Sequence, residues 1–402
     1  MTTLQACNNT ARNTGTTVAM DSQQPSTATV NNTEVVMGAA RTNEYVPLLK
    51  GKRVALLSNQ TGMVGDKHTL DLMLERGVNV VTIFSPEHGF RGKADAGEHV
   101  SSSVDEKTGI PIASLYDGKS PMPSKQVMDG IDVIVTDIQD VGLRFYTYYV
   151  TMINLMDAAI TYNKQFMVLD RPNPNGMYVD GPILDMSLKS GVGRLPIPTV
   201  HGMTLGELAQ MANGEGWLKD GKKCDLTVIP CGNYTHQTRY ALPIAPSPNL
   251  PNMLSIYLYP SMCYFEGTTV SLGRGTDWPF QVYGHPDMTG YAFDFTPTSR
   301  FGAKTPPQMD KLCHGVDLHN LAAEDVIAKG INLEYVIDAY RNLTKNGHEF
   351  YLKSNFFDKL MGTTRVREMI AEGKSAQEIK ATWQADVEQF KLQRKPYLLY
   401  EE

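Results

Sequence analysis

Residues 85–92 carry three side chains that can do chemistry, directly after the strongly apolar residues 78–84. Glu87 supplies a carboxylate, His88 an imidazole and Arg91 a guanidinium. The β-branched residues before them predict a strand, and a proline and a glycine predict a turn that presents Glu87 outward. Apolar neighbours raise the pKa of a carboxyl group, which suits Glu87 to proton transfer, and His88 could tune or share that proton.

A second candidate carboxylate, Glu266, lies with Arg274 in the glycine-rich residues 265–277. The backbone at glycine can approach a ligand closely, and the aromatic residues that follow suit a sugar ring. A proton donor and a second carboxylate are the minimum equipment for glycoside hydrolysis. A tight hairpin with a solvated glutamate is the structural alternative. A phosphate-binding loop is disfavoured because the spacing matches no P-loop and no lysine follows.

Polar residues also follow the other predicted strands of the first half of the chain. The carboxyl ends of parallel strands meet at one edge of a sheet, where open α/β sheets bind ligands. We therefore expect these side chains to converge: Asn59, Asp137, Asp140, Arg144, Asp170 and Arg171. Each of them could instead cap the next helix or pair with a neighbouring charge.

The elements that must position these residues alternate along the chain from residue 52, which predicts a parallel sheet with helices on both faces. We expect strands at 53–58, 78–84, 131–136, 166–169 and 226–229. We expect helices near 66–76, 122–129, 146–162 and 205–213, the last with a capping box from Thr204 to Glu207. The first strand is not followed by G-x-G-x-x-G, so no nicotinamide or flavin cofactor is expected.

After residue 235 several prolines impose an extended segment, which marks a domain boundary. Mixed strands to about 301 and helices at 321–344 and 375–392 should follow, the second helix opened by a capping box at Ser375. The sequence thus predicts an α/β protein. It has a tether over 1–44, a Rossmann-like domain over 45–235 and a smaller α/β (α+β) domain over 236–402, with the active-site cleft between the two domains.

Composition narrows the class of protein. The 402 residues carry a net charge of −6 and show no basic stripe, which argues against a nucleic-acid partner. No window approaches the roughly eighteen apolar residues of a membrane helix. The five cysteines lack metal-site or redox spacing. Residues 4–7 resemble the end of a bacterial lipoprotein signal, but no apolar segment precedes Cys7, which leaves a lipid anchor there open.

Five ordered motifs resemble one family, the NamZ-type exo-β-N-acetylmuramidases, formerly a bacterial domain of unknown function. They lie at residues 85–92, 137–148, 169–174, 247–251 and 265–268. The resemblance implies removal of N-acetylmuramic acid (MurNAc) from the non-reducing ends of peptidoglycan fragments. It assigns Glu87 as the acid of an E-H-G motif and Glu266 to an E-G-T motif. Thr269 departs from the family pattern, which has asparagine there.

The implied substrate carries a lactyl carboxylate, which an arginine can bind through two parallel hydrogen bonds. Arg144 and Arg274 are the favoured candidates for this contact. Substrate contacts are expected from the strand ends and motifs together: Asn59, Arg91, Asp137, Asp140, Arg144, Tyr146, Asp170, Arg171, Asn249 and Arg274. We expect no metal and no cofactor, a periplasmic or cell-envelope location, and a monomer or homodimer.

Two other classes of function are alternatives to a glycoside hydrolase. A metal-dependent hydrolase would use Glu87, His88, Asp137 and Asp140 as ligands, but nine scattered histidines without H-x-x-x-H spacing disfavour it. A noncatalytic glycan-binding lipoprotein would bind peptidoglycan fragments without releasing sugar.

Overall fold

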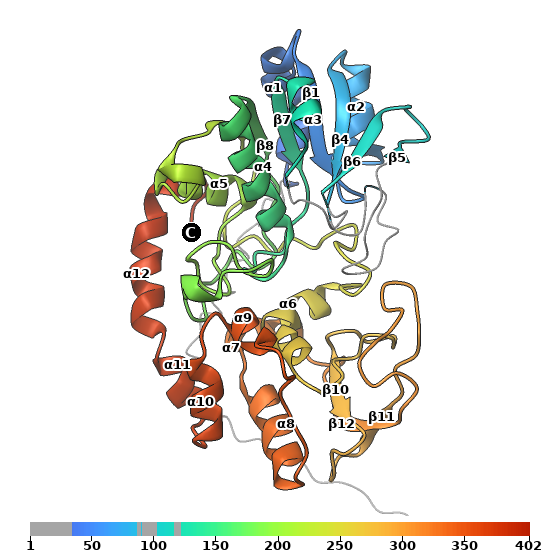
Figure 1. Cartoon of the computed structure of the whole chain (residues 1–402), viewed down its shortest axis with the longest axis vertical. Coiled ribbons are helices and arrows are strands. Elements are labelled where there is room, and N and C mark those ends of the chain that lie inside the picture. The colour runs from blue at the N-terminus through green and yellow to red at the C-terminus, as the bar shows by residue number, and fades with distance from the viewer. Residues whose placement is uncertain (1–33, 87–89, 91–102, 116–121) are drawn as a thin grey trace, which may run out of the picture. The chain divides into compact units, whose positions relative to one another are not determined.

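The computed structural model describes residues 34–86, 90, 103–115 and 122–402. Residues 35–402 form one compact unit. Its larger sheet has the strand order β5-β6-β4-β1-β7-β8-β9 (Figure 1). The six strands from β6 to β9 pair in parallel, while β5 is antiparallel to β6 at the edge. The order of the parallel strands is that of the doubly wound Rossmann sheet, even though the glycine fingerprint is absent.

The bounds of these strands follow the predicted alternation closely. They are β1 (Arg53–Ser58), β4 (Asn79–Ser85), β5 (Ser103–Val104), β6 (Pro111–Ser114), β7 (Val133–Asp137), β8 (Gln165–Leu169) and β9 (Asp225–Ile229). A small hairpin of β2 (Met63–Val64) and β3 (Lys67–His68) follows β1. The predicted strands are confirmed to within two or three residues, while β5 and β6 were not predicted.

Two sets of helices cover the two faces of this sheet. Successive residues of a strand point to opposite faces, so each strand contributes to both apolar clusters. Ala55 and Leu57 of β1 pack in one apolar cluster with α3 (Lys125–Asp129), α4 (Tyr148–Tyr162) and α5 (Leu205–Gly214). Val54 and Leu56 pack in another with α1 (Thr42–Leu49) and α2 (Thr69–Glu75). The predicted capping box at the start of α5 is present.

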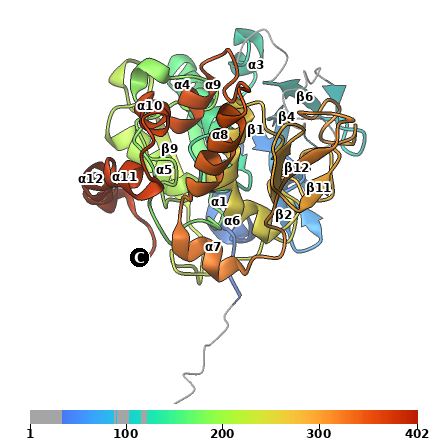
Figure 2. The same ribbon diagram turned by 90° about the horizontal axis from the view of Figure 1, so that it is seen from below.

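The second part of the fold contains a three-stranded antiparallel sheet in the order β10-β12-β11. Its strands are β10 (Val282–His285), β11 (Phe293–Phe295) and β12 (Cys313–Asp317). Helix α8 (Glu334–Lys345) lies beside this sheet (Figure 2), where the Tyr283 hydroxyl donates a 2.8 Å hydrogen bond to Asp338. The predicted α/β class with a second, smaller part is confirmed. The boundary at residue 235 stays a prediction.

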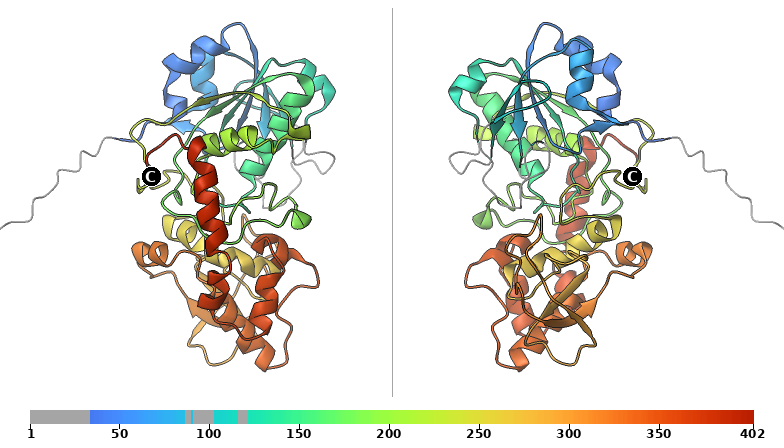
Figure 3. Two further views of the ribbon diagram at one scale, coloured as in Figure 1. Left: turned by 90° about the vertical axis from the view of Figure 1, so that its left-hand side faces the viewer. Right: turned by 90° about the vertical axis from the view of Figure 1, so that its right-hand side faces the viewer.

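Further helices complete this part: α6 (Met253–Met262), α7 (Ala323–Lys329), α9 (Phe356–Met361), α10 (Arg365–Ala371), α11 (Ala376–Ala381) and α12 (Gln384–Arg394). The single helix predicted over 321–344 is wrong, because Gly330 at φ +60° separates α7 from α8. The helix predicted over 375–392 is likewise two helices, α11 and α12, although its capping box at Ser375 is present. Figure 3 shows α12 running from the smaller part toward the large sheet.

Candidate active site

The strand order reverses between β1 and β7, which is where doubly wound sheets leave a crevice for ligands. Ser58 at the end of β1 pairs in register with Asp137 at the end of β7. The Asp137 carboxylate accepts a 2.6 Å hydrogen bond from Arg171 Nε and a 2.5 Å bond from the Thr69 hydroxyl. All of these side chains are buried. Asp137 and Arg171 therefore neutralise each other and join the ends of β7 and β8 to the start of α2.

Asn59, directly after β1, links this strand end to Tyr148 at the start of α4. Its side-chain oxygen accepts from both the backbone and the hydroxyl of Thr61, and its Nδ2 donates to the Tyr148 hydroxyl at 2.9 Å. The hydroxyls of Tyr148 and Tyr146 both donate to the carbonyl of Pro246, at 2.9 and 3.0 Å. These bonds fix the two tyrosine rings against the proline-rich segment.

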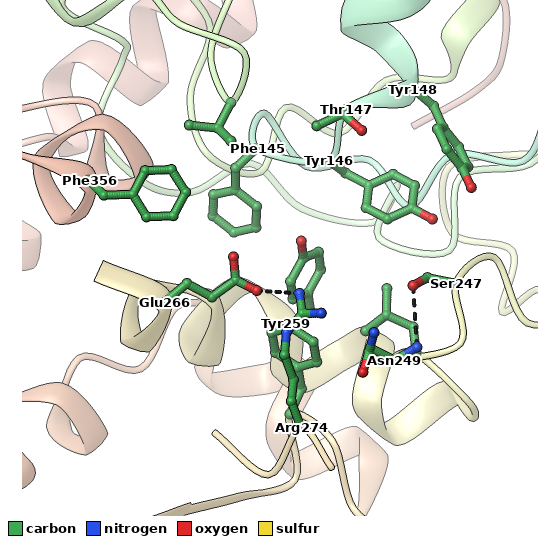
Figure 4. Close-up of a pocket in the computed structure, with 13 residues that line it drawn as sticks. Phe145, Tyr146, Thr147, Tyr148, Ser247, Asn249, Tyr259, Glu266, Arg274 and Phe356 are labelled. Atoms are coloured by element: carbon green, nitrogen blue, oxygen red, sulfur yellow. Dashed lines mark hydrogen bonds and ion pairs between the residues drawn. The ribbon is translucent and has the colours of Figure 1, made fainter. Parts of the chain in front are cut away.

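A pocket of about 240 Å³ opens in front of these tyrosines (Figure 4). Its walls come from the loop before α4, the proline-rich segment, α6, the 3₁₀ helix η4 (Cys263–Gly267) and the start of α9. Aromatic side chains dominate the lining, together with one carboxylate and one guanidinium. The lining residues are Phe145, Tyr146, Thr147, Tyr148, Val192, Ser247, Asn249, Leu250, Tyr259, Glu266, Arg274, Phe280 and Phe356.

Glu266 and Arg274 form an ion pair inside this pocket, with 2.5 Å between Oε1 and Nη2. The guanidinium also lies over the Phe280 ring, 5.2 Å from its centroid. Burial lowers the pKa of Arg274, but the Glu266 carboxylate outweighs burial, so the pKa is raised above its usual range. The pair holds a fixed cation and a fixed anion against an aromatic surface.

Tyr259 is a lining residue that sequence analysis missed. It belongs to α6, and Figure 4 shows its hydroxyl on the pocket side, between Glu266 and Tyr146. Burial raises the pKa of this tyrosine well above its usual range, so the phenol stays neutral and can both donate and accept a hydrogen bond. Tyr259 and Glu266 are seven residues apart, about two helical turns, which puts them on the same face. That spacing is the signal that could have found it.

The predicted site residues fall into three groups. Tyr146, Asn249, Glu266 and Arg274 line the pocket. A second group lies outside the lining: Asn59, Asp137, Asp140, Arg144, Asp170 and Arg171. Glu87, His88 and Arg91 lie outside the described residues, although Ser85 before them is fully buried at the end of β4. The structure thus brings Glu266 and Arg274 of the glycine-rich residues 265–277 together with Tyr146 and Asn249, which come from the motifs at 137–148 and 247–251.

Arg144 has a structural environment. Its side chain is fully buried, and Nη2 donates to the Thr199 hydroxyl and to the carbonyls of Leu360 and Met361, at 3.2, 2.9 and 3.0 Å. These carbonyls end helix α9, so the guanidinium ties this helix to the loop before α4. Burial lowers the pKa of Arg144. Arg144 is not among the residues that line the pocket, and the lactyl contact predicted for it stays a prediction.

Asp170 and Asp140 are also enclosed. Asp170 accepts from the hydroxyls of Thr204 and Tyr400, both at 2.6 Å, and from the backbone of Gly206, so it anchors the start of α5 and the chain's last residues. Burial raises the pKa of Asp170 to about 6. Asp140 accepts from the backbone of Gly142 at 2.7 Å, while its Oδ2 is buried without a hydrogen-bond partner among the described residues.

Two other predicted features have defined places. Asn249 lines the pocket, but its Nδ2 donates to the carbonyl of Gly302 at 2.7 Å, which fixes its orientation. Thr269, the residue predicted to depart from the family pattern, donates through its hydroxyl to the carbonyl of Glu349 at 2.9 Å.

The described part of the chain contains no group of three or more His, Cys, Asp or Glu side chains arranged to hold a metal ion. Within the same residues, no helix is long and apolar enough to cross a membrane.

Comparison with known proteins covers both halves of the fold. The family models for the N-terminal and C-terminal domains of exo-β-N-acetylmuramidase NamZ match residues 54–254 and 257–400. The peptidoglycan β-N-acetylmuramidase NamZ of Bacillus subtilis (strain 168) is 39% identical over 375 residues, which cover 89% of each chain. The resemblance found in the five motifs is therefore confirmed.

Two crystal structures of DUF1343 family proteins from Bacteroides fragilis NCTC 9343 share the fold. One is 62% identical with a TM-score of 0.86, and covers 92% of this chain and 100% of its own. The other is 29% identical with a TM-score of 0.77, and covers 91% of this chain and 99% of its own. With both of its parts matched, the chain belongs to the NamZ family of exo-β-N-acetylmuramidases.

Proposed function

We propose that this protein is an exo-acting glycoside hydrolase that removes MurNAc from the non-reducing ends of peptidoglycan fragments. The observation that carries the proposal is the match of both NamZ family models, whose two regions together supply the lining of one pocket. Tyr146 and Tyr148 come from the first region, and Glu266 and Arg274 from the second. Aromatic faces beside a charged pair suit a sugar ring with polar substituents.

The ion pair limits what Glu266 can do. A carboxylate 2.5 Å from a guanidinium is suited to accept hydrogen bonds from sugar hydroxyls or to stabilise positive charge at the anomeric carbon. One of its two oxygens, Oε1, is already bonded to Arg274 Nη2. We propose Glu87, which matches the E-H-G motif of the family, as the proton donor of the reaction.

The test compares a chromogenic MurNAc glycoside with its N-acetylglucosamine (GlcNAc) counterpart. The protein should release the chromophore from the first and not from the second. Release from both would indicate a broader hexosaminidase, and binding without release from either would favour the noncatalytic glycan-binding alternative.

Replacing Glu87 by glutamine tests the proton donor. Glu87→Gln keeps the size of the side chain but cannot donate a proton, so turnover should fall by roughly 10²- to 10⁴-fold with the unfolding midpoint unchanged. Glu372→Gln, an exposed glutamate after α10, is the matched control and should keep full turnover. Near-normal turnover of Glu87→Gln would exclude it as the acid.

Peptidoglycan lies outside the cytoplasmic membrane, so we also propose a periplasmic or cell-envelope location. Fractionation of cells that express the full chain, with labelled lipid precursor to detect an anchor at Cys7, tests this proposal. Recovery of the protein in the cytoplasm alone would contradict it.

A further inference from the structure

The proposed substrate makes a demand that can be met by only a few residues. MurNAc differs from GlcNAc by a lactyl ether that carries a carboxylate, and a carboxylate taken into a pocket needs a cation or several donors to replace water. An enzyme that prefers MurNAc should therefore place a positive charge where the lactyl group binds. This reasoning rests on the proposed function and extends it to the residue that distinguishes the two sugars.

Arg274 is the cation in a position to do this. Of the described residues that line the pocket, it has the one cationic side chain. Arg144 is fully buried outside the lining and bonded to carbonyls of α9. Arg171 also lies outside the lining and forms a buried ion pair with Asp137.

The geometry of Arg274 leaves donors for a second anion. Nη2 binds Glu266, while Nε is buried without a hydrogen-bond partner among the described residues. Figure 4 shows the second terminal nitrogen pointing away from Glu266, toward the side of the pocket where Tyr146 and Asn249 lie. The Glu266 bond and the Phe280 ring fix the plane of the guanidinium before any ligand arrives, which lowers the entropy cost of binding.

We propose that Arg274 determines the preference for MurNAc by binding its lactyl carboxylate, and that Glu266 limits the strength of this contact. Glu266 does so because its own charge neutralises the guanidinium and repels the incoming carboxylate. GlcNAc brings no second anion and is insensitive to this balance. The two members of the ion pair thus act on selectivity in opposite directions, which a merely structural ion pair would not do.

The test is equilibrium binding of MurNAc and GlcNAc to the full chain, measured by calorimetry, so that it does not depend on turnover. In Arg274→Gln the ratio of MurNAc to GlcNAc affinity should fall by roughly 10- to 100-fold, as expected for loss of a hydrogen bond between charged groups. In Glu266→Gln, which keeps a hydrogen-bond partner for the arginine but removes the negative charge, the same ratio should rise. Arg274→Lys should retain part of the preference, because it keeps the charge and loses the planar fork.

A ligand-side measurement covers the case in which Arg274→Gln does not fold. The methyl ester of MurNAc lacks the charge of the acid and is larger by only one methyl group, and the unaltered protein should bind it with nearly the affinity of GlcNAc. Equal affinity for ester and acid would overturn the proposal, as would an equal fall for both sugars in Arg274→Gln. A fall of the ratio in Glu266→Gln would overturn the limiting role of that residue.

These results separate the inference from the proposed function. Hydrolysis of MurNAc glycosides with unchanged selectivity in Arg274→Gln would refute the inference alone. Charge-dependent binding of MurNAc without any hydrolysis would refute the proposed activity and leave Arg274 as the residue that recognises the lactyl group.

Discussion

Asp140 offers the sharpest test of how this sheet edge is built, because its carboxyl group is buried and half satisfied. Oδ1 accepts from the backbone of Gly142, and Oδ2 has no hydrogen-bond partner among the described residues. Burial raises the pKa of Asp140 from 3.8 to about 7, although backbone hydrogen bonds act in the opposite direction. Asp140→Asn has nearly the same shape but never carries the charge.

The sign of the effect follows from the direction of the shift. Because folding raises this pKa, the folded state holds the proton more tightly than the unfolded state, and stability falls as the pH rises from about 4 to about 7. A shift of about three units at about 1.4 kcal/mol each gives a loss of about 4 kcal/mol above pH 7. Roughly a third of this is already lost at pH 5, since the unfolded carboxyl group is ionised there.

Urea unfolding of the unaltered protein and of Asp140→Asn, at pH 5 and at pH 8.5, measures this difference. The advantage of the variant in free energy of unfolding should grow by roughly 2 to 3 kcal/mol between the two pH values. Asp66→Asn, an exposed aspartate in the turn between β2 and β3, serves as the control and should show no such growth. Parallel pH profiles for Asp140→Asn and the unaltered protein would refute the reasoning.

Two matched pairs of substitutions test other contacts through the free energy of unfolding. A Cβ on Gly362 would lie 1.9 Å from Arg144 Nη1, while Gly373 has a similar positive φ and open space. Gly373→Ala should lower the free energy of unfolding by about 1 to 2 kcal/mol through backbone strain. Gly362→Ala should lower it by about 2 kcal/mol more, because Arg144 must also shift. Equal losses would show that Arg144 moves freely. Tyr400→Phe removes a hydroxyl bonded to a buried carboxylate and should cost about 1 to 3 kcal/mol. Tyr397→Phe, at an exposed bond, should stay within about 0.5 kcal/mol, and a similar loss in both would argue against the buried network.

The large sheet could be predicted from the sequence because each strand carries its own local signal. In β7, all five residues are buried, as expected for a central parallel strand, and β-branched residues dominate it. The edge strand β5 and its neighbour β6 were missed because they lack such a signal: they have two and four residues and too little apolar content to stand out.

Helix α6 was missed because it lacks the features that identify a helix. It follows the proline-rich segment, contains Pro260, and is buried from Ser255 to Met262 on all sides, so its apolar residues show no 3.6-residue period. The capping box from Asn252 to Ser255 was its one local signal. That omission also hid Tyr259, because its alignment with Glu266 exists only if the chain between them is helical.

The polar residues at the strand ends show a second reason why the candidate site could not be fully predicted from the sequence. An aspartate after a parallel strand can face a ligand or hold the fold together, and nothing within a few residues of Asp137 distinguishes the two roles. What decides is Arg171, 34 positions later, whose guanidinium takes both carboxylate oxygens in a buried pair. When neighbouring strand ends carry opposite charges, mutual neutralisation is therefore the first expectation, since an unpaired buried charge costs several kcal/mol. By the same argument, Glu266 and Arg274 stand apart, because their pair keeps unused donors and faces an open pocket.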